Sequence, residues 1–204
     1  METNEFWKGA FGNSYQERQK ESKVGSVESN IQFFIKSIYE YFQHRDLNSI
    51  VEVGAGTGQN IKALHEMWPE IKLKSIELNP IAAHQIPYGE VYIGDALKIE
   101  WPKADLVLTK GFLIHIPPED IPCIFDKIIN AANKYILLCE YYNPTPIEIP
   151  YRGHAGKLWK RDFAGEMLDR YPQLSLADYG FAYHLDEYPQ DDLNWFLLEK
   201  TNAL

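Results

Sequence analysis

The apolar residues of this chain alternate between short continuous runs and helical stripes. Strands are predicted at residues 49–53, 72–78, 104–109 and 134–140, with a further strand after Gly89. Helices are predicted at residues 28–43, 59–67 and 118–132, and after Asn79-Pro80. Strands that are apolar throughout and alternate with helices predict a parallel sheet covered on both faces.

This alternation stops at Tyr141. Residues 141–160 are rich in Pro, Tyr and charge and predict a long ordered loop, followed by a helix at 161–171. Residues 174–185 and 194–200 predict a terminal pair of strands. We therefore expect an α/β, Rossmann-like fold with a seven-stranded, mostly parallel sheet closed by an antiparallel hairpin. Ligands of such sheets bind over the carboxyl ends of the strands.

The N-terminal residues have a different character. The segment from Phe6 to Arg18 is aromatic and glycine-rich and has no strand pattern. We expect a single domain, with a helical cap or lid and a packing helix at 1–45 and a core at 46–204. As parts of a lid, Tyr15 and Arg18 are candidates to touch cofactor or substrate. Aromatic side chains that anchor a tail to the core are the alternative.

Three glycines at alternate positions follow the first predicted strand. Gly54, Gly56 and Gly58 stand after Glu52, at a point where the absence of side chains lets a ligand approach the backbone. The second predicted strand ends in Glu77, and Asp95 stands at the tip of the third. A glycine turn with carboxylates at successive strand ends predicts a site for S-adenosylmethionine (SAM), whose product is S-adenosylhomocysteine. Leu78, Ala96 and Lys110 complete the predicted cofactor-binding set.

A nicotinamide dinucleotide is the competing ligand for such a turn. Its usual motif is G-x-G-x-x-G, whose third glycine would fall at Gln59. SAM has no pyrophosphate and carries a sulfonium cation, so nearby acids suit it better than they suit a dinucleotide. The sequence also lacks the G-x-x-x-x-G-K-[ST] pattern of a P-loop.

The acceptor site is expected beside the ends of the fourth and fifth strands. His115 follows the fourth strand and is a candidate base or substrate contact, because imidazole titrates near neutral pH. Packing of the loop over the cofactor is its alternative role. Tyr142 and Asn143 follow the fifth strand and are further catalytic candidates. The Asn-Pro-Thr-Pro stretch makes Asn143 a candidate substrate contact or a turn residue.

Cations gather in the loop after the fifth strand, although the protein as a whole is acidic. The candidates for substrate binding there are Tyr151, Arg152, His154, Lys160 and Arg161. An aromatic-framed basic loop favours an anionic small substrate, with Arg152 as a bidentate clamp on a carboxylate or phosphate. Salt bridges that pin the loop are the alternative.

Composition narrows the function classes. The 204 residues carry a formal net charge of −9, which argues against nucleic-acid and anionic-membrane surfaces. The sequence shows no apolar run of membrane length, no apolar leader and no metal-ligand spacing. We expect Cys123 and Cys139 to be buried free thiols, as in a protein of the cytoplasm.

Several motifs together carry a family resemblance. The chain resembles the pseudaminic acid biosynthesis-associated methylases, class I SAM-dependent methyltransferases, over nearly its full length. The motifs are Phe6-Trp-Lys-Gly-Ala-Phe-Gly, Val51-Glu-Val-Gly-Ala-Gly-Thr-Gly, Ile76-Glu-Leu-Asn-Pro, Leu108-Thr-Lys-Gly-Phe-Leu-Ile-His-Ile, Glu140-Tyr-Tyr-Asn-Pro-Thr-Pro, Tyr151-Arg-Gly-His, Lys160-Arg-Asp-Phe-Ala-Gly-Glu and Asp191-Asp-Leu-Asn-Trp-Phe-Leu-Leu-Glu-Lys.

The resemblance implies N- or O-methylation of a nonulosonic (sugar) acid intermediate of bacterial surface glycan synthesis. A methyltransferase of peptide or protein side chains and a non-catalytic SAM-binding subunit are the alternatives. The expected partner is an anionic small molecule, and a homodimer is possible.

Overall fold

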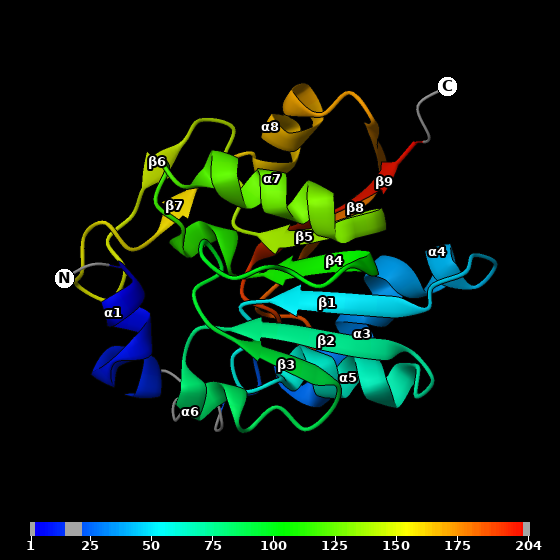
Figure 1. Ribbon diagram of the computed structural model, residues 1–204, viewed down its shortest axis with the longest axis horizontal. Coiled ribbons are helices and arrows are strands. Elements are labelled where there is room, and N and C mark those ends of the chain that lie inside the picture. Colours follow the sequence, from blue (N-terminus) through cyan, green and yellow to red (C-terminus); the bar gives the residue numbers. More distant parts are fainter. Residues whose placement is uncertain (1–2, 15–21, 202–204) are drawn as a thin grey trace.

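Seven strands form the central sheet of this protein, of which a computed structural model describes residues 3–14 and 22–201 (Figure 1). The strands are β1 (Ser49–Val53), β2 (Lys72–Glu77), β3 (Glu90–Ile93), β4 (Ala104–Lys110), β5 (Ala132–Glu140), β8 (Leu174–Ala182) and β9 (Leu193–Lys200). Their order is β3-β2-β1-β4-β5-β9-β8. Strands β1 to β5 pair in parallel, whereas β9 is antiparallel to both β5 and β8. The expected Rossmann-like sheet with a terminal antiparallel hairpin is confirmed.

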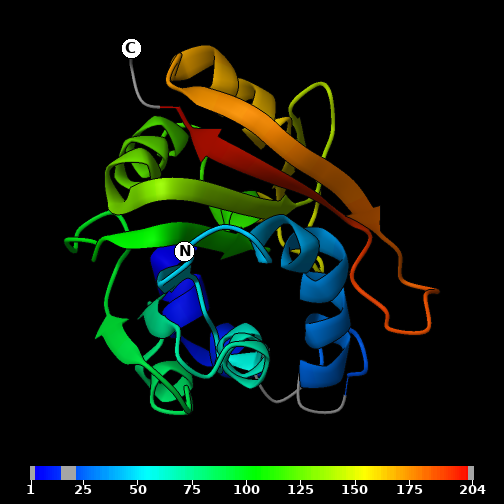
Figure 2. The same ribbon diagram turned by 90° about the vertical axis from the view of Figure 1, so that its right-hand side faces the viewer.

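Helices cover both faces of this sheet. The helical elements are α1 (Thr3–Lys8), α3 (Val27–Phe34), the π-helix η1 (Ile35–Tyr39), α4 (Glu40–Phe42), α5 (Gln59–Met67), α6 (Pro80–Ala83), the 3₁₀ turn η2 (Leu113–His115), α7 (Ile121–Ala131) and α8 (Phe163–Arg170). Helices α3 and α5 pack on one face, and α7 and α8 lie on the other (Figure 2).

Each strand contributes to two apolar cores because successive side chains point to opposite faces. On β1, Val51 and Val53 join the cluster under α7 and α8, whereas Ile50 joins the cluster under α3 and α5. On β4, Val107 and Leu106 divide in the same way. These core strands are buried on both faces, which explains why their sequences are apolar throughout.

Some predicted elements differ from the observed ones. The helix predicted at 28–43 is divided by η1, and the loop at 141–160 contains a hairpin of β6 (Ile147–Glu148) and β7 (Trp159–Lys160). The following helix begins at Phe163, because the side chain of Asp162 accepts a hydrogen bond from the N–H of Gly165 and caps it.

The expectation for Cys123 is wrong. Its thiol is exposed, whereas Cys139 is buried. Helix α7 buries Ile121, Ile124 and Ile128, and Cys123 stands off this stripe.

The carboxyl ends of the parallel strands face α1 and the β6–β7 hairpin (Figure 1). Helix α1 thus lies at the end of the sheet where a ligand is expected. Among the described residues, no helix is both long and apolar enough to cross a membrane.

Candidate functional site

A cavity of about 630 Å³ opens at the carboxyl ends of β1 to β4, and its volume suits a cofactor together with a small ligand. Seven of the predicted cofactor-binding residues line it: Gly54, Gly56, Glu77, Leu78, Asp95, Ala96 and Lys110. His115 lines the same cavity. The parallel order of the strands brings these residues together from distant parts of the sequence.

The glycine turn approaches the cavity with a backbone that side chains would obstruct. Gly54 has φ of 75°, and a Cβ on it would lie 2.7 Å from the Phe112 ring. Gly58 also has a positive φ, but among the described residues it serves as the N-cap of α5 and does not line the cavity. Gly54 therefore shapes the site directly, and Gly58 begins the helix behind it.

Glu77 ties the glycine turn to the end of β2. One carboxylate oxygen accepts a hydrogen bond of 2.7 Å from the Gly56 N–H, and the other accepts one of 2.7 Å from the Asn79 N–H. Burial raises the pKa of Glu77, while these N–H groups favour its ionised form. Glu77 thus shapes the cavity and also lines it.

Glu52 lies one side chain behind the cavity wall. Its carboxylate accepts a 2.6 Å hydrogen bond from Asn60, and Asn60 lines the cavity. Burial raises the pKa of Glu52 to about 8. Within the described part of the chain, Oε2 of Glu52 and Oδ1 of Asn60 are buried and have no donor. These two buried oxygens need a polar partner at this point, and a cationic or N–H group placed there would favour the ionised form of Glu52.

Lys110 supplies a cation at the same end of the cavity. Burial lowers its pKa, and its ammonium donates to the Asn30 side-chain oxygen at 3.3 Å. Gln190, from the β8–β9 connection, donates to the same oxygen at 3.2 Å. Helix α3 and the β8–β9 connection therefore meet at Lys110 and hold it near the cavity.

Asp95 stands at the tip of the short strand β3 and begins a turn. Its side chain accepts a hydrogen bond of 3.0 Å from the Leu97 N–H, and Lys98 approaches it at 3.4 Å. Glu119 and Asp120 line the cavity as well, and burial, followed by the nearby carboxylates of Glu119 and Asp95, raises the pKa of Asp120. This part of the cavity is accordingly acidic.

His115 is held in one orientation at the other side of the cavity. Its Nδ1 lies 2.7 Å from the carbonyl oxygen of Lys157, which can only accept a hydrogen bond. Nδ1 must therefore carry the proton, which leaves the Nε2 lone pair for another group. Burial lowers the pKa of His115 to about 4, so that the ring is neutral at neutral pH.

Aromatic rings enclose His115. The Trp7 ring lies 4.4 Å from the imidazole, and the Tyr151 ring lies 5.0 Å from it. Trp7 comes from α1 and lines the cavity, whereas Phe6 beside it is buried in the core. The N-terminal segment thus combines the two roles considered for it, since Phe6 anchors it and Trp7 reaches the site.

Three candidates after β5 stand away from the cavity in the described structure. Tyr142 is exposed and its ring lies near Phe196, while the Asn143 amide hydrogen-bonds to the carbonyl of Thr145. Lys160 lies 5.0 Å from the ring of Tyr141. The Asn143 contact is that of a turn residue.

The remaining basic candidates, Arg152, His154 and Arg161, are not among the residues that line the cavity in the described structure. Arg161 forms two hydrogen bonds with Glu166, of 2.8 and 2.9 Å. Arg152 has φ of 49° and lies beside the Tyr151 ring, and the His154 ring packs on Phe6. The pairing of Arg161 corresponds to the loop-pinning alternative. Tyr15 and Arg18 lie outside the described residues.

The structure adds residues that sequence reasoning did not select. Lys157 lies in the basic loop but is not among the sequence candidates, yet it lines the cavity and its carbonyl orients His115. Glu140 was passed over as the end of a strand, although its carboxylate reaches the turn that carries His115. The signal for Glu140 in the sequence is a charged residue at the end of an otherwise apolar strand.

The donors and acceptors of the cavity fit SAM. The two buried acceptors at Glu52 and Asn60 suit an ammonium group, and Lys110 suits a carboxylate. The carboxylate of Glu77 suits a ribose diol, and the acidic lining suits a sulfonium. Among the described residues, no cluster of three or more His, Cys, Asp or Glu side chains could hold a metal ion.

The sequence matches the O-methyltransferase domain family over residues 1–140. It is 32% identical over 76 residues to a caffeic acid 3-O-methyltransferase of Capsicum annuum, covering 37% of this chain and 21% of that protein. It is 32% identical over 79 residues to a flavonoid 3'-O-methyltransferase of Mentha piperita, covering 38% of this chain and 22% of that protein. The alignments span about a fifth of the length of these curated relatives.

Solved structures share the fold. Magnesium protoporphyrin IX methyltransferase of Synechocystis with bound SAM superposes with a TM-score of 0.70 and 12% identity, over 98% of both chains. An O-methyltransferase of a Brevibacillus brevis polyketide assembly gives a TM-score of 0.63 and 15% identity, over 98% of this chain and 80% of that one. These likenesses establish the fold, and the family match over residues 1–140 establishes the family: the chain belongs to the O-methyltransferase domain family, and its cofactor is SAM.

Proposed function

We propose that this protein is a SAM-dependent O-methyltransferase that methylates a hydroxyl group of a small molecule, with His115 as the base. The orientation of His115 carries the proposal. Because the Lys157 carbonyl holds the proton on Nδ1, Nε2 is the atom that can accept a proton from a hydroxyl group. The low pKa keeps this atom unprotonated at neutral pH.

When bound, SAM supplies an electrophilic methyl group. The acceptor oxygen must lose its proton as it forms the new C–O bond, and Nε2 of His115 takes this proton. The chain otherwise aligns acceptor and methyl group, which is the larger part of such catalysis. Trp7 and Phe112 provide apolar walls that exclude water around the reacting atoms.

The same low pKa limits how basic His115 is, and this bears on the acceptor. A weak base removes a proton more readily from an acidic hydroxyl, such as a phenol, than from an alcohol. The named substrates of the two curated relatives, caffeic acid and a flavonoid, are phenols. Lys157, which also lines the cavity, suits an anionic group on the acceptor. A small phenolic acid therefore stands first among acceptors.

The sugar acid predicted from the sequence is the second acceptor class. Its support was the basic loop, and Arg152, Lys160 and Arg161 stand outside the cavity lining in the described structure. Lys110 and Lys157 still allow a carboxylate or phosphate. The catalytic roles of Tyr142 and Asn143, the substrate role of Arg152, the domain boundary at residue 45, the homodimer and the cytoplasmic location stay predictions.

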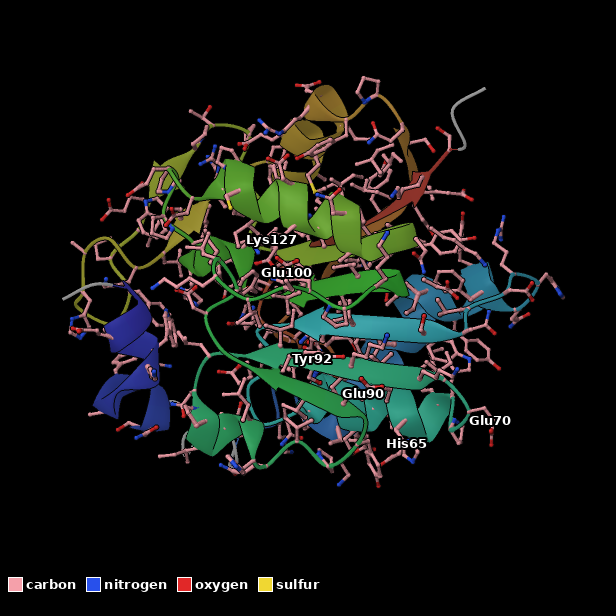
Figure 3. The ribbon with its side chains drawn as sticks, viewed as in Figure 1. His65, Glu70, Glu90, Tyr92, Glu100 and Lys127 are labelled. Atoms are coloured by element: carbon pink, nitrogen blue, oxygen red, sulfur yellow. The ribbon has the colours of Figure 1, made fainter. Side chains whose placement is uncertain are left out.

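The test is a methyl-transfer assay that measures S-adenosylhomocysteine formation with phenolic acids and with nonulosonic acids. We expect turnover with a phenolic acid, and His115→Gln should lower kcat by about 10²- to 10⁴-fold while SAM affinity is kept. His65→Gln is the matched control, because His65 stacks on Tyr88 at 3.8 Å and lies on α5 away from the carboxyl ends of the strands (Figure 3).

Each other outcome selects an alternative. Turnover only with nonulosonic acids would restore the sugar-acid prediction, and methyl groups found on peptides would favour a side-chain methyltransferase. Tight SAM binding without any methyl transfer would favour a non-catalytic subunit. Full activity of His115→Gln would show that His115 is not the base.

A further inference from the structure

Glu140 is a buried carboxylate at the carboxyl end of β5, and it reaches the turn that follows β4. Its side chain is almost fully enclosed, at 4% exposure. Oε1 accepts hydrogen bonds from the backbone N–H groups of Phe112, at 3.2 Å, and Leu113, at 3.1 Å. Oε2 accepts a third from the N–H of Ile114, at 3.3 Å. Both oxygens of one carboxylate therefore serve three consecutive N–H groups.

These N–H groups open the 3₁₀ turn η2, which ends in His115. The first N–H groups of any helix have no partner within the helix and need acceptors from outside. Phe112, at the N-cap position, makes no side-chain capping bond. The capping function has passed to a residue 28 positions later in the chain, on the neighbouring strand.

The side chains of Leu113 and Ile114 anchor the turn in the apolar core under α7 and α8. Its backbone is tied to the sheet by hydrogen bonds. Gly111, just before it, has φ of 64°, a backbone conformation that most residues avoid. Its N–H bonds to the carbonyl of Cys139 at 2.9 Å, which continues the pairing of β4 with β5. Beyond that bond, the backbone from Phe112 to Ile114 is held to β5 by Glu140.

We propose that Glu140 is a positioning residue that holds His115 at the cavity by fixing the backbone of the Phe112–Ile114 turn. Glu140 acts at one end of the turn, while the Lys157 carbonyl fixes the imidazole ring at the other. The importance of this positioning for methyl transfer rests on the proposed function. The positioning itself is a property of the protein without cofactor or acceptor, and it can be measured there.

Glu140→Gln is the sharpest variant because it keeps the size of the side chain. An amide has a single oxygen acceptor, and its NH₂ group would face an N–H donor that now meets a carboxylate oxygen. At least one of the three N–H groups then loses its partner. Glu140→Asp retains the charge but is shorter, so it reaches the turn less well.

The matched control is Asp105→Asn. Asp105 is also a buried carboxylate that accepts a backbone N–H bond, from Asn48 at 2.9 Å, but it stands at the opposite end of β4. Both substitutions replace a buried carboxylate by an amide. A general loss of stability should thus appear in both variants, whereas a displaced His115 should appear only in Glu140→Gln.

The experiment uses amide hydrogen exchange and nitrogen-detected NMR of histidine side chains on the full chain. We expect the N–H groups of residues 112–114 to exchange at least about tenfold faster in Glu140→Gln. We also expect the His115 ring to lose its single Nδ1–H tautomer and to titrate nearer its ordinary pKa of 6.5. Asp105→Asn should keep the wild-type exchange at these residues and the wild-type His115 signals.

Unchanged exchange at residues 112–114 and an unchanged His115 tautomer in Glu140→Gln would overturn the proposal. Where Glu140→Gln does not fold, Glu140→Asp is measured in the same way, and wild-type behaviour there would overturn it equally. Since neither readout needs methyl transfer, a failure of the proposed function leaves this result standing, and the reverse is also true.

Discussion

The Nδ1 atom of His115 lies 2.7 Å from the carbonyl oxygen of Lys157, although 42 residues separate the two in sequence. This hydrogen bond joins the turn after β4 to the loop that connects β5 with α8. It selects one tautomer of the imidazole, and burial of the ring keeps that tautomer neutral. The long loop thus contributes a backbone atom to the site, whereas sequence reasoning looked to its charged side chains.

The lowered pKa of His115 predicts that this residue makes the free energy of unfolding depend on pH. Between pH 6.5 and 4 the unfolded chain takes up a proton on His115, but the folded protein does not. Stability from this residue is therefore present above pH 6.5 and is lost as the pH falls to 4. A shift of this size corresponds to about 3 kcal/mol.

Urea unfolding of wild type and His115→Gln across this pH range tests the effect. The free energy of unfolding of wild type, minus that of the variant, should fall by about 3 kcal/mol from pH 6.5 to pH 4. Glu52 and Glu140 have raised pKa values, so they increase the free energy of unfolding as the pH falls, which is opposite to the effect of His115. Because both proteins carry these residues, taking the difference removes their contributions. Parallel curves would show that His115 titrates normally in the folded state.

Glu77→Gln should weaken SAM binding at least about tenfold, because an amide cannot accept from both the Gly56 and the Asn79 N–H groups. The glycine turn would then lose one of its fixed points. Calorimetric titration with SAM measures the change. Glu90→Gln is the control: Glu90 lies on β3, away from the cavity lining of the described structure, and its carboxylate accepts a hydrogen bond of 2.8 Å from the Tyr92 hydroxyl (Figure 3). Equal affinities in the two variants would remove Glu77 from the cofactor site.

Much of the fold could be predicted because the signals are local. The apolar strands, the glycine turn and the start of a helix at Asn79-Pro80 each depend on a few consecutive residues. Cys123 could also have been placed correctly, since the stripe of Ile121, Ile124 and Ile128 excludes it from the buried face of α7. The helical period of the buried residues indicates that Cys123 is exposed, whereas the apolar sequence around it led to the wrong prediction.

The outer part of the site was less predictable because its geometry depends on tertiary contacts. Arg161 is a substrate-binding candidate in the sequence, yet it pairs with Glu166. Whether a cation points into a cavity or along its rim depends on the path of the loop, which the pattern of residue types does not encode. Glu140 illustrates the converse, because its role depends on which turn lies beside the end of β5.

Gly54→Ala and Gly111→Ala separate backbone strain from steric clash. Both residues have a positive φ, of 75° and 64°, so each substitution carries a similar strain of about 1 kcal/mol. A Cβ at position 54 would also lie 2.7 Å from the Phe112 ring. Apart from its chain neighbours, no atom of the described residues would lie within 4 Å of a Cβ at position 111. We expect both variants to lose thermal stability, but only Gly54→Ala to lose SAM affinity in calorimetry. Similar SAM affinities would show that Phe112 can move aside.

The pair formed by Arg161 and Glu166 distinguishes loop pinning from substrate binding. Their side chains are 16% and 30% exposed and lie 2.8 Å apart, so the coupling should reach about 1 kcal/mol. Arg161→Met and Glu166→Gln should each lower the free energy of unfolding, and the double variant should lose less than the sum.

The same three variants should bind SAM as wild type does, and their KM for the acceptor should change together or not at all. A substrate clamp predicts otherwise: Arg161→Met alone would raise KM, while Glu166→Gln, which frees the guanidinium, would leave KM unchanged or lower it. The Glu166 variant therefore decides between the two roles, because pinning requires both partners and clamping requires only the arginine.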